Sequence, residues 1–350
     1  MSEGRIFLQG QWWPLQPESI PALQAAVASP WEEDVVEALR SWWNDAEVVI
    51  TSTSGSTGNP RPIQHAKAAM EESAKRTLHH FGLMEGATAG LAMPVKFIGG
   101  MMMLVRAVVG KLDLVAVQPQ ACPDFGALPC SSLDFLPLTP SQAQAFHASD
   151  SSSWARIQCL LLGGGPVNRA WLGTLDGGPR IVESFGMTET ISHFALRKVH
   201  PNPEEDFHCL PGFEVSSGEQ EALVIDGPDG TRWETRDVAQ VLSSRSFKWL
   251  GRLDGVINSG GIKIHPERVE WILSGFLTEP FKCYGKPDAR WGEILILRID
   301  SEAAPPDAEA MRDRILAWAD DHLPKHHAPK MVEWAPLERT WTGKWKMPHA

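Results

Sequence analysis

The stretch Thr51-Ser-Thr-Ser-Gly-Ser-Thr-Gly-Asn-Pro-Arg61 decides the fold class. It follows the apolar run Val48-Val49-Ile50, which is typical of a buried strand. Gly55 and Gly58 can adopt positive φ and bring backbone N–H groups close to an anion. Hydroxyl donors are added by Ser54, Ser56 and Thr57. The stretch therefore predicts a phosphate-binding loop.

A flexible Ser/Gly linker is the alternative interpretation, and composition alone favours it. The loop, however, stands between a strand-like run and a helix-like run from Ala66 to Leu78, where anion-binding loops occur in α/β proteins. Pro60 also stiffens the end of the loop. The loop is not a Walker motif, because no Gly-Lys-Ser/Thr follows at the required spacing.

Length and charge limit the class of protein. The chain has 350 residues, of which 43% are apolar, which is enough for two domains with a sizeable core. The formal charge of −11, without a basic tract, argues against nucleic acid or an anionic membrane surface as a partner. No apolar run approaches the roughly 20 residues that span a bilayer, so membrane insertion is not expected.

The N-terminus and the cysteines predict a cytoplasmic protein. Residues Met1-Ser2-Glu3-Gly4-Arg5 lack the charged and apolar blocks of a secretory signal. Five cysteines are scattered without a Cys-x-x-Cys pair, which favours reduced thiols over zinc ligands or a disulfide framework. The sequence leaves open whether the chain forms a homo-oligomer.

An alternating pattern of strands and helices predicts an α/β fold. We expect a hairpin over residues 5–14, a helix over 31–44, and strands over 112–117, 157–162 and 180–185. A second region begins near Gly251, and the expected elements there are helices over 266–273 and 307–322 and a strand over 294–299. We predict a large N-terminal α/β domain (1–253), with sheets flanked by helices, and a small mobile C-terminal α+β domain (254–350).

Several further segments combine glycine with functional side chains. Gly163, Gly164 and Gly165 end a strand, where they form either a plain turn or a flat surface for a ring. Phe185-Gly186-Met187-Thr188-Glu189-Thr190 ends the next strand with an aromatic ring, a hydroxyl and a carboxylate, although an aromatic residue at a strand end usually belongs to the core. Thr235-Arg236-Asp237 ends an irregular stretch and is either a surface turn or a diol receptor.

Cationic residues in glycine-containing loops complete the pattern. They occur in Gly251-Arg252-Leu253-Asp254, in Ser259-Gly260-Gly261-Ile262-Lys263 and in Thr342-Gly343-Lys344. A lone lysine is normally a solvated surface charge, so these segments carry weight only together with the others.

Read in order, these segments resemble the adenylate-forming superfamily of acyl-CoA synthetases, luciferase-like enzymes and peptide-synthetase adenylation domains. The resemblance covers about residues 48 to 346 and implies binding of ATP, Mg²⁺ and CoA. It implies phosphate contacts from Thr53, Ser54, Gly55, Ser56, Thr57, Gly58 and Arg61. It implies an adenine site formed by Gly163, Gly164, Gly165 and Phe185, with Gly186 and Met187 as further cofactor-binding residues. It also implies that Thr188 touches the α-phosphate, that Glu189 binds the metal, and that Asp237 and Arg252 hold the ribose.

The resemblance also assigns moving parts. Asp254 is the implied hinge, Ser259, Gly260 and Gly261 line the implied CoA channel, and Lys344 is the implied adenylation lysine. A lysine at the far end of the chain reaches a loop at residue 55 only if a small domain folds over it, which requires such a hinge.

Three departures from the superfamily pattern stand out. Arg61 replaces the usual Lys, Phe185 replaces the usual Tyr, and Arg236 replaces the usual Gly of the Thr-Gly-Asp motif. Arginine keeps the positive charge and phenylalanine keeps the stacking face, so the first two changes are compatible with catalysis. The chain is also shorter than most members ahead of the phosphate loop.

The longer strings 185–197, 256–263 and 94–106 are similar to those of short o-succinylbenzoate–CoA ligases, which implies 2-succinylbenzoate as the acid substrate. A second carboxylate needs a cation, and Arg106 closes the apolar run 101–105, where an unpaired guanidinium is costly to bury. A surface-pointing Arg106 is the alternative. Ser192 and His193 are weaker candidates for acid contacts, and His193 suits a structural role equally well.

Two other functions compete with this one. One is another acid–CoA ligase, and the other is a nucleotide-binding protein without catalysis. The presence of Glu189, Asp237 and Lys344 together argues against a binding protein, which has no use for a distant lysine.

Overall fold

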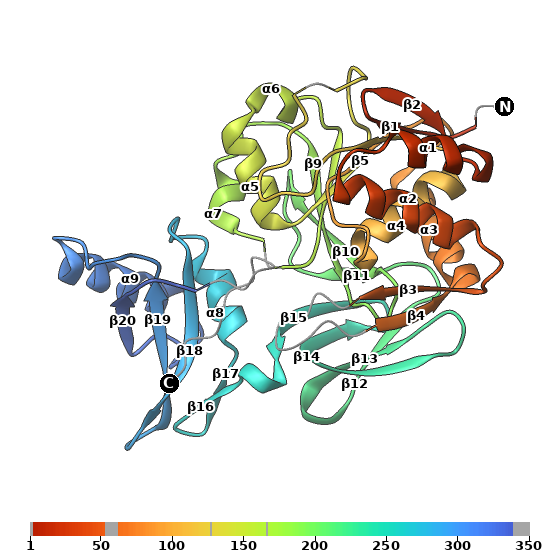
Figure 1. The fold of residues 1–350 in the computed structure, drawn as a ribbon. Coiled ribbons are helices and arrows are strands. Elements are labelled where there is room, and N and C mark those ends of the chain that lie inside the picture. Colours follow the sequence, from red (N-terminus) through yellow and green to blue (C-terminus); the bar gives the residue numbers. More distant parts are fainter. Residues whose placement is uncertain (1–2, 53–61, 127, 166, 339–350) are drawn as a thin grey trace. The chain divides into compact units, whose positions relative to one another are not determined.

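The computed structural model describes residues 3–52, 62–126, 128–165 and 167–338. The chain divides into two compact units (Figure 1). The first comprises Met1–Gly165 and Asp176–Glu204, and the second comprises Pro166–Leu175 and Glu205–Ala350. The predicted boundary at residue 254 falls inside the second unit and stays a prediction.

The first unit begins with a four-stranded sheet. Its order is β2 (Gln11–Pro14), β1 (Arg5–Leu8), β6 (Asp113–Ala116) and β5 (Thr88–Leu91). The predicted hairpin is the antiparallel pair β1–β2, and β6 runs parallel to both β1 and β5. Parallel strands need crossover connections, and helices supply them here. The helices of this part are α1 (Ile20–Ala26), α2 (Pro30–Trp43), α3 (Lys67–Phe81) and α4 (Ile98–Gly110), with the 3₁₀ turn η1 (Pro17–Ser19) ahead of them.

Helix α4 is central to this part because it is apolar on all sides. It packs against β5 and β6, and both α2 and α3 pack against it. Met101, Met102 and Val105 of α4 join Val49 and Met70 in one buried cluster. A helix that is hydrophobic all round is buried, and Arg106 in its last turns is carried into the interior with it.

A second group of strands in the first unit positions the nucleotide motifs. The strands β7 (Leu136–Leu138), β8 (Cys159–Leu162) and β9 (Arg180–Gly186) are parallel, and β10 (His193–His200) is antiparallel to β9. Helices α5 (Pro140–Ser149) and α6 (Ser151–Trp154) connect β7 to β8. All four residues of β8 are buried, as expected for a parallel strand covered on both faces. The carboxyl ends of β8 and β9 therefore lie at one edge of the sheet.

The predicted phosphate loop joins two strands, which corrects the expectation that a helix follows it directly. Strand β3 (Val48–Ser52) precedes the loop, and β4 (Pro62–Ala66) follows it. The two strands pair in antiparallel orientation. Helix α3 begins only at Lys67. The argument from a helix N-terminus therefore does not apply to this loop.

The second unit contains two sheets. The strands of the first are β12 (Glu214–Ser217), β13 (Ala222–Asp226), β14 (Arg232–Ser243), β15 (Ser246–Arg252) and β11 (Phe207–Cys209), all antiparallel to their neighbours in this order. The second has the order β17 (Ile262–Ile264), β16 (Ile257–Ser259), β19 (Gly292–Ile299) and β18 (Phe281–Asp288), and β20 (Met331–Trp334) pairs with β19. The helices are α7 (Arg169–Gly173), α8 (Pro266–Leu273) and α9 (Ala308–His322), with 3₁₀ turns η2 (Glu219–Glu221) and η3 (Leu253–Gly255).

Helices α8 and α9 share one core with the second sheet. Val269 and Leu273 of α8 and Ile315 of α9 pack with Leu295 and Leu297 of β19. The predicted α/β fold, with helices packed on sheets, is confirmed. Within the described ranges, no helix combines the length and the hydropathy that crossing a bilayer requires.

Candidate active site

Three glycines follow β8, and the first of them lies close to β9. Ser184 of β9 donates a hydrogen bond to the carbonyl of Leu162 at 2.8 Å. A Cβ on Gly163 would lie 2.6 Å from Ser184 Oγ, so a larger residue there would displace this hydroxyl from its hydrogen bond to Leu162. Gly164 has φ +80°, which favours glycine. Gly163 therefore lets β8 and β9 end close together, whereas a Cβ on Gly165 would meet no other atom.

The end of β9 presents Phe185 in a half-buried position. The ring makes an edge-to-face contact with the fully buried Phe194 at 5.7 Å between centroids. A Cβ on Gly186 would lie 2.3 Å from the carbonyl oxygen of Ser192, so the neighbouring strand requires glycine at this position. Phe194 therefore packs against the Phe185 ring, while part of the ring surface stays accessible, as stacking on a base requires.

A tight turn follows, and Thr190 holds it. The Thr190 hydroxyl accepts from Met187 N–H at 3.1 Å and lies 3.0 and 2.7 Å from the carbonyl oxygens of Met187 and Ser192. The backbone N–H of Ile191 donates to the carbonyl of Thr188. Thr188 and Glu189 thus lie at the exposed tip of a fixed turn. Sequence reasoning did not single out Thr190, since a buried threonine after this motif has no distinguishing pattern.

The three residues proposed for the acid substrate lie together in the first unit. Arg106 donates to Ser192 Oγ at 2.7 Å, and Ser192 Oγ lies 3.3 Å from His193 Nδ1. His193 Nε2 lies 3.2 Å from Thr77 Oγ1, which also donates to the carbonyl of Ser73. The result is a buried chain of polar contacts from α4 through β10 to α3.

Arg106 is buried, which rules out the surface-pointing alternative. Arg106 is only 2% exposed, and burial away from water lowers the pKa of its guanidinium to about 10. Met103 Sδ and Ser192 Oγ are its neutral contacts, at 3.6 and 2.7 Å. In the part of the chain that the structure describes, its Nε has no hydrogen-bond partner and no carboxylate forms an ion pair with it. A charged guanidinium held only by neutral contacts keeps unpaired donors that suit an anion.

His193 is neutral near pH 7. Burial lowers its pKa well below the usual value, and the charges of Arg106, His80 and Arg76 act in the same direction. A neutral imidazole can accept one hydrogen bond and donate the other between Ser192 and Thr77. His193 therefore relays the hydrogen bonds that fix Ser192.

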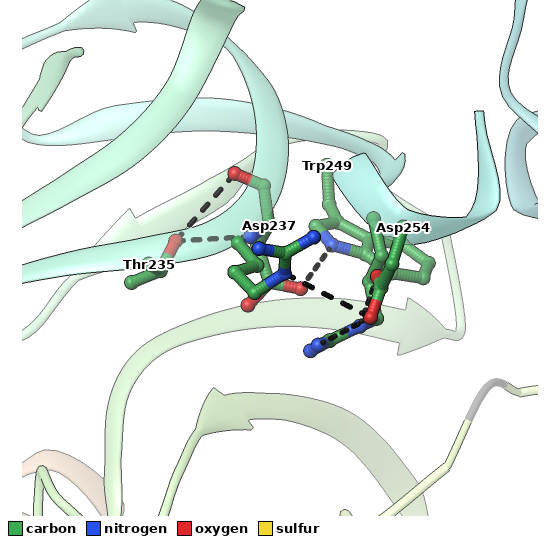
Figure 2. A network of polar contacts seen from close by, with 6 residues as sticks. Thr235, Asp237, Trp249 and Asp254 are labelled. Carbon is green, nitrogen blue, oxygen red and sulfur yellow. Dashed lines mark hydrogen bonds and ion pairs between the residues drawn. The ribbon is translucent and has the colours of Figure 1, made fainter. Parts of the chain in front are cut away.

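In the second unit, Thr235, Arg236 and Asp237 lie within strand β14, which corrects the expectation of an irregular stretch or surface turn. Figure 2 shows how Asp237 is held. Trp249 Nε1 donates to its Oδ1 at 3.0 Å, and Thr235 Oγ1 accepts from its backbone N–H at 3.1 Å. Burial raises the pKa of Asp237, opposed by the Trp249 hydrogen bond and the charge of Arg252. Trp249 is a second residue that sequence reasoning missed, because the contact is visible only across paired strands.

Arg252 lies opposite Asp237 in the register of β14 and β15. Its guanidinium donates from Nε and Nη2 to Asp254, at 3.1 and 3.3 Å. Asp254 is the middle residue of the short turn η3, which follows β15. The predicted ribose residues and the predicted hinge residue thus form one polar cluster.

Ser259, Gly260 and Gly261 form the tip of a hairpin, with Ser259 in strand β16. Gly260 and Gly261 have φ of +60° and +83°, as a two-residue hairpin turn requires. A Cβ on Gly260 would lie 2.7 Å from the Trp291 ring, and Gly260 N–H donates to the Trp291 carbonyl. The role of this tip in binding CoA stays a prediction.

The phosphate loop 53–61 and Lys344 lie outside the described residues, so their roles stay predictions. A residue at the base of the loop was missed: His65 of β4 is buried and lies 3.0 Å from Thr51 Oγ1. Burial lowers its pKa, and the charge of Glu189 opposes that shift. Among the described residues, no group of three or more metal-ligating side chains is present.

Comparisons with known proteins identify the family and the fold. A family model described as AMP-binding enzyme matches residues 15–285. The chain belongs to the AMP-binding enzyme family. A solved acyl-CoA synthetase (AMP-forming)/AMP-acid ligase II-like protein from Dyadobacter fermentans is 31% identical to this AMP-binding enzyme, with a TM-score of 0.61, over 91% of this chain and 93% of the other.

Named relatives point to acid–CoA ligases. A feruloyl-CoA synthase from Amycolatopsis is 27% identical over 86% of this chain and 68% of its own length. A 2-succinylbenzoate–CoA ligase from Listeria monocytogenes is 24% identical over 87% of this chain and 70% of its own. The o-succinylbenzoate CoA synthetase of Bacillus subtilis, solved with ATP and magnesium, shares the fold, with 18% identity and a TM-score of 0.70 over 97% of this chain and 82% of that one. The predicted resemblance to adenylate-forming enzymes is confirmed.

Proposed function

We propose that this AMP-binding enzyme is an ATP-dependent acid–thiol ligase that joins 2-succinylbenzoate to CoA, as in menaquinone biosynthesis, and releases AMP and pyrophosphate. Membership of the family and the named relatives support the reaction class. ATP and CoA are available in the cytoplasm, where we expect the enzyme to act.

The reaction needs ATP because a carboxylate does not exchange its oxygen for a thiol at neutral pH. The carboxylate attacks the α-phosphorus, which forms an acyl-adenylate and releases pyrophosphate. The CoA thiolate then attacks the acyl carbon, and AMP leaves with the carboxylate oxygen. Negative charge accumulates on phosphate oxygens in the first step, so positioned donors and cations supply most of the catalysis.

The residues of this chain divide that work. Phe185 stacks on the adenine over the glycines at 163–165, and Asp237 accepts from the ribose hydroxyls. Thr188 donates to the α-phosphate, and Lys344 and the loop 53–61 bind phosphate oxygens. Glu189, a single exposed carboxylate at the tip of the Thr190 turn, suits Mg²⁺, which keeps several waters and takes its other ligands from substrate phosphates. The metal would neutralise phosphate charge there.

The observation that carries the choice of acid is Arg106. Its buried guanidinium meets neutral Ser192 and Met103 but no carboxylate in the described part of the chain. Such a cation is costly unless an anion occupies the site during function. The carboxylate of 2-succinylbenzoate that does not react fits this requirement, and we assign it to Arg106 and Ser192.

A second candidate is a ligase for monocarboxylic aromatic acids, which the similarity to feruloyl-CoA synthase favours. A panel of 2-succinylbenzoate, ferulate and benzoate separates the two in an assay of CoA-dependent AMP release. We expect the highest kcat/KM with 2-succinylbenzoate. A higher value with ferulate or benzoate contradicts the assignment of the acid, and no AMP release with any carboxylic acid contradicts the ligase.

The two half-reactions test the division of labour. Lys344→Ala should abolish adenylate formation and largely spare thioester formation from supplied adenylate, because the lysine acts on the phosphate charge of the first step. Single-turnover measurements of each half-reaction check this. Equal loss of both half-reactions contradicts it.

A further inference from the structure

Two arginines from different strands share the carboxylate of Asp254. Arg252, at the end of β15, donates to it at 3.1 and 3.3 Å. Arg236 of β14 approaches from the other strand, with 3.9 Å between its Nε and Asp254 Oδ2. Figure 2 shows the dashed contacts that meet at Asp254.

Arg236 has no visible role in holding the sheet. Its side chain is 63% exposed, and in strand β14 it lies between the half-buried Thr235 and Asp237. The superfamily pattern has glycine at this position, so the side chain is not needed for the Thr-x-Asp motif to bind nucleotide. What the arginine adds in this chain is its ion pair with Asp254.

Both arginines stabilise the ionised form of Asp254, Arg252 more than Arg236. Partial burial alone would raise its pKa, but hydrogen bonds from Arg252 and the charges of Arg252 and Arg236 outweigh that effect and hold the pKa below its usual value. Asp254 is therefore ionised at neutral pH. Its carboxylate ties η3 to β15 through Arg252 and to β14 through Arg236.

We propose that Arg236 restrains Asp254 and thereby slows the domain rotation that separates the two half-reactions. The proposal rests on the proposed function and on the hinge that the family resemblance implies at residue 254. A hinge residue changes its backbone torsions, and its side chain moves relative to a strand that stays in place. The pair with Arg236 must then open for each rotation, whereas Arg252 precedes Asp254 by only two residues and can follow it.

The expected effect is small because exposed ion pairs are weak. Removing one such pair changes a rate or an equilibrium by about two- to fivefold. Arg236→Gln should therefore speed thioester formation from enzyme-bound adenylate by about two- to fivefold and leave adenylate formation unchanged, provided that rotation limits the second step. Arg236→Lys keeps the charge and should stay close to wild type.

Arg232→Gln is the matched control. Arg232 lies on the same strand, is 56% exposed, and pairs with Asp226 at 2.9 Å, away from the hinge. It should leave both half-reactions unchanged. Salt gives a second readout: raising ionic strength should speed wild-type thioester formation toward the Arg236→Gln rate, while the variant itself changes little.

Hydrogen exchange tests the restraint without relying on activity. Backbone amides in residues 253–257 should exchange faster in Arg236→Gln than in wild type or Arg232→Gln. Equal exchange in all three proteins overturns the proposal, as does an equal change in both half-reactions. Absence of adenylate with every acid would instead contradict the proposed function, and the exchange measurement would still decide whether Arg236 restrains residue 254.

Discussion

Two sets of charged residues, one in each unit, differ in their access to water. In the first unit, Arg106 is 2% exposed, and the Glu183–Arg197 pair, at 2.6 Å, has side chains only 9% and 8% exposed. In the second unit, the side chains of Arg236, Arg252 and Asp254 are 63%, 47% and 51% exposed. Buried charges must be paired or bind a ligand, whereas exposed pairs form and open at little cost.

This difference suits two tasks. A fixed cation can select a substrate, because the protein has already met the cost of burying it. An exposed ion pair suits a segment that changes conformation, since water replaces the lost contact. Variants of both sets of residues test whether burial determines how much each charge contributes to stability and to substrate binding.

The largest effect is expected at the buried pair of the first unit. Arg197 of β10 donates to Glu183 of β9, two residues before Phe185. Arg197→Leu leaves Glu183 buried without this partner and should lower the free energy of unfolding by about 3–5 kcal/mol. Urea denaturation followed by tryptophan fluorescence measures the change.

The double variant Glu183→Leu with Arg197→Leu is the control, because it removes both charges and should recover much of the loss. A cost below about 1 kcal/mol for Arg197→Leu, similar to that of an exposed pair, would remove the distinction between the units.

The next effect concerns acid recognition. Arg106→Met removes the charge at similar length and should raise the KM for 2-succinylbenzoate by about 10- to 100-fold, because charge-assisted hydrogen bonds are lost. The KM for benzoate should change little. Steady-state kinetics with both acids check this, and an unchanged KM for 2-succinylbenzoate would show that Arg106 does not bind the acid.

The effect of Arg106→Met on stability should differ from that of Arg197→Leu. Since Arg106 has no carboxylate partner among the described residues, Arg106→Met should not destabilise the protein. A loss of several kcal/mol would mean that the guanidinium has a structural role.

A smaller effect is expected at Asp237, which lies in the second unit but is more buried than the charges around Asp254. Burial raises its pKa, so the carboxylate becomes protonated at a higher pH than an ordinary aspartate as the solution is acidified. The ionised form accepts the ribose hydroxyls, so ATP affinity should fall on acidification through this raised pKa. Asp237→Asn should weaken ATP binding about tenfold and flatten that pH dependence. Calorimetric titration with ATP at several pH values measures this. If Asp237 does not bind ATP, wild type and Asp237→Asn will show the same dependence of ATP affinity on pH.

The smallest effect belongs to the exposed pair far from the hinge. Arg232→Leu breaks the contact with Asp226 and should change the free energy of unfolding by less than about 1 kcal/mol. Urea denaturation alongside Arg197→Leu makes the comparison direct. Equal costs for the two variants would contradict the role given to burial.

Strong local signals made much of the fold predictable. The helix over residues 266–273 was predicted with its observed bounds, because Pro266 marks its first turn and apolar residues recur at helical spacing. The strand at 180–185 and the helix at 307–322 likewise match β9 and α9 within one residue at each end. The sequential order of the motifs identified the family.

Contacts between distant segments were less accessible. Strand β4 contains Pro62, Gln64 and His65, and it is a strand only because it pairs with β3. Thr235–Asp237 read as irregular because its alternation of exposed and half-buried residues lacks apolar side chains. The contact between Asp237 and Trp249 and the three bonds of Thr190 depend on pairing and turn geometry, which no single segment encodes.

The central claim is that a carboxylate of the substrate attacks the α-phosphorus of ATP. Incubation with CoA, ATP and 2-succinylbenzoate labelled with oxygen-18 in its carboxyl groups tests it directly. Mass spectrometry of the nucleotide should find one labelled oxygen in AMP, with none in pyrophosphate. Unlabelled AMP, or label in inorganic phosphate together with ADP, would contradict the account.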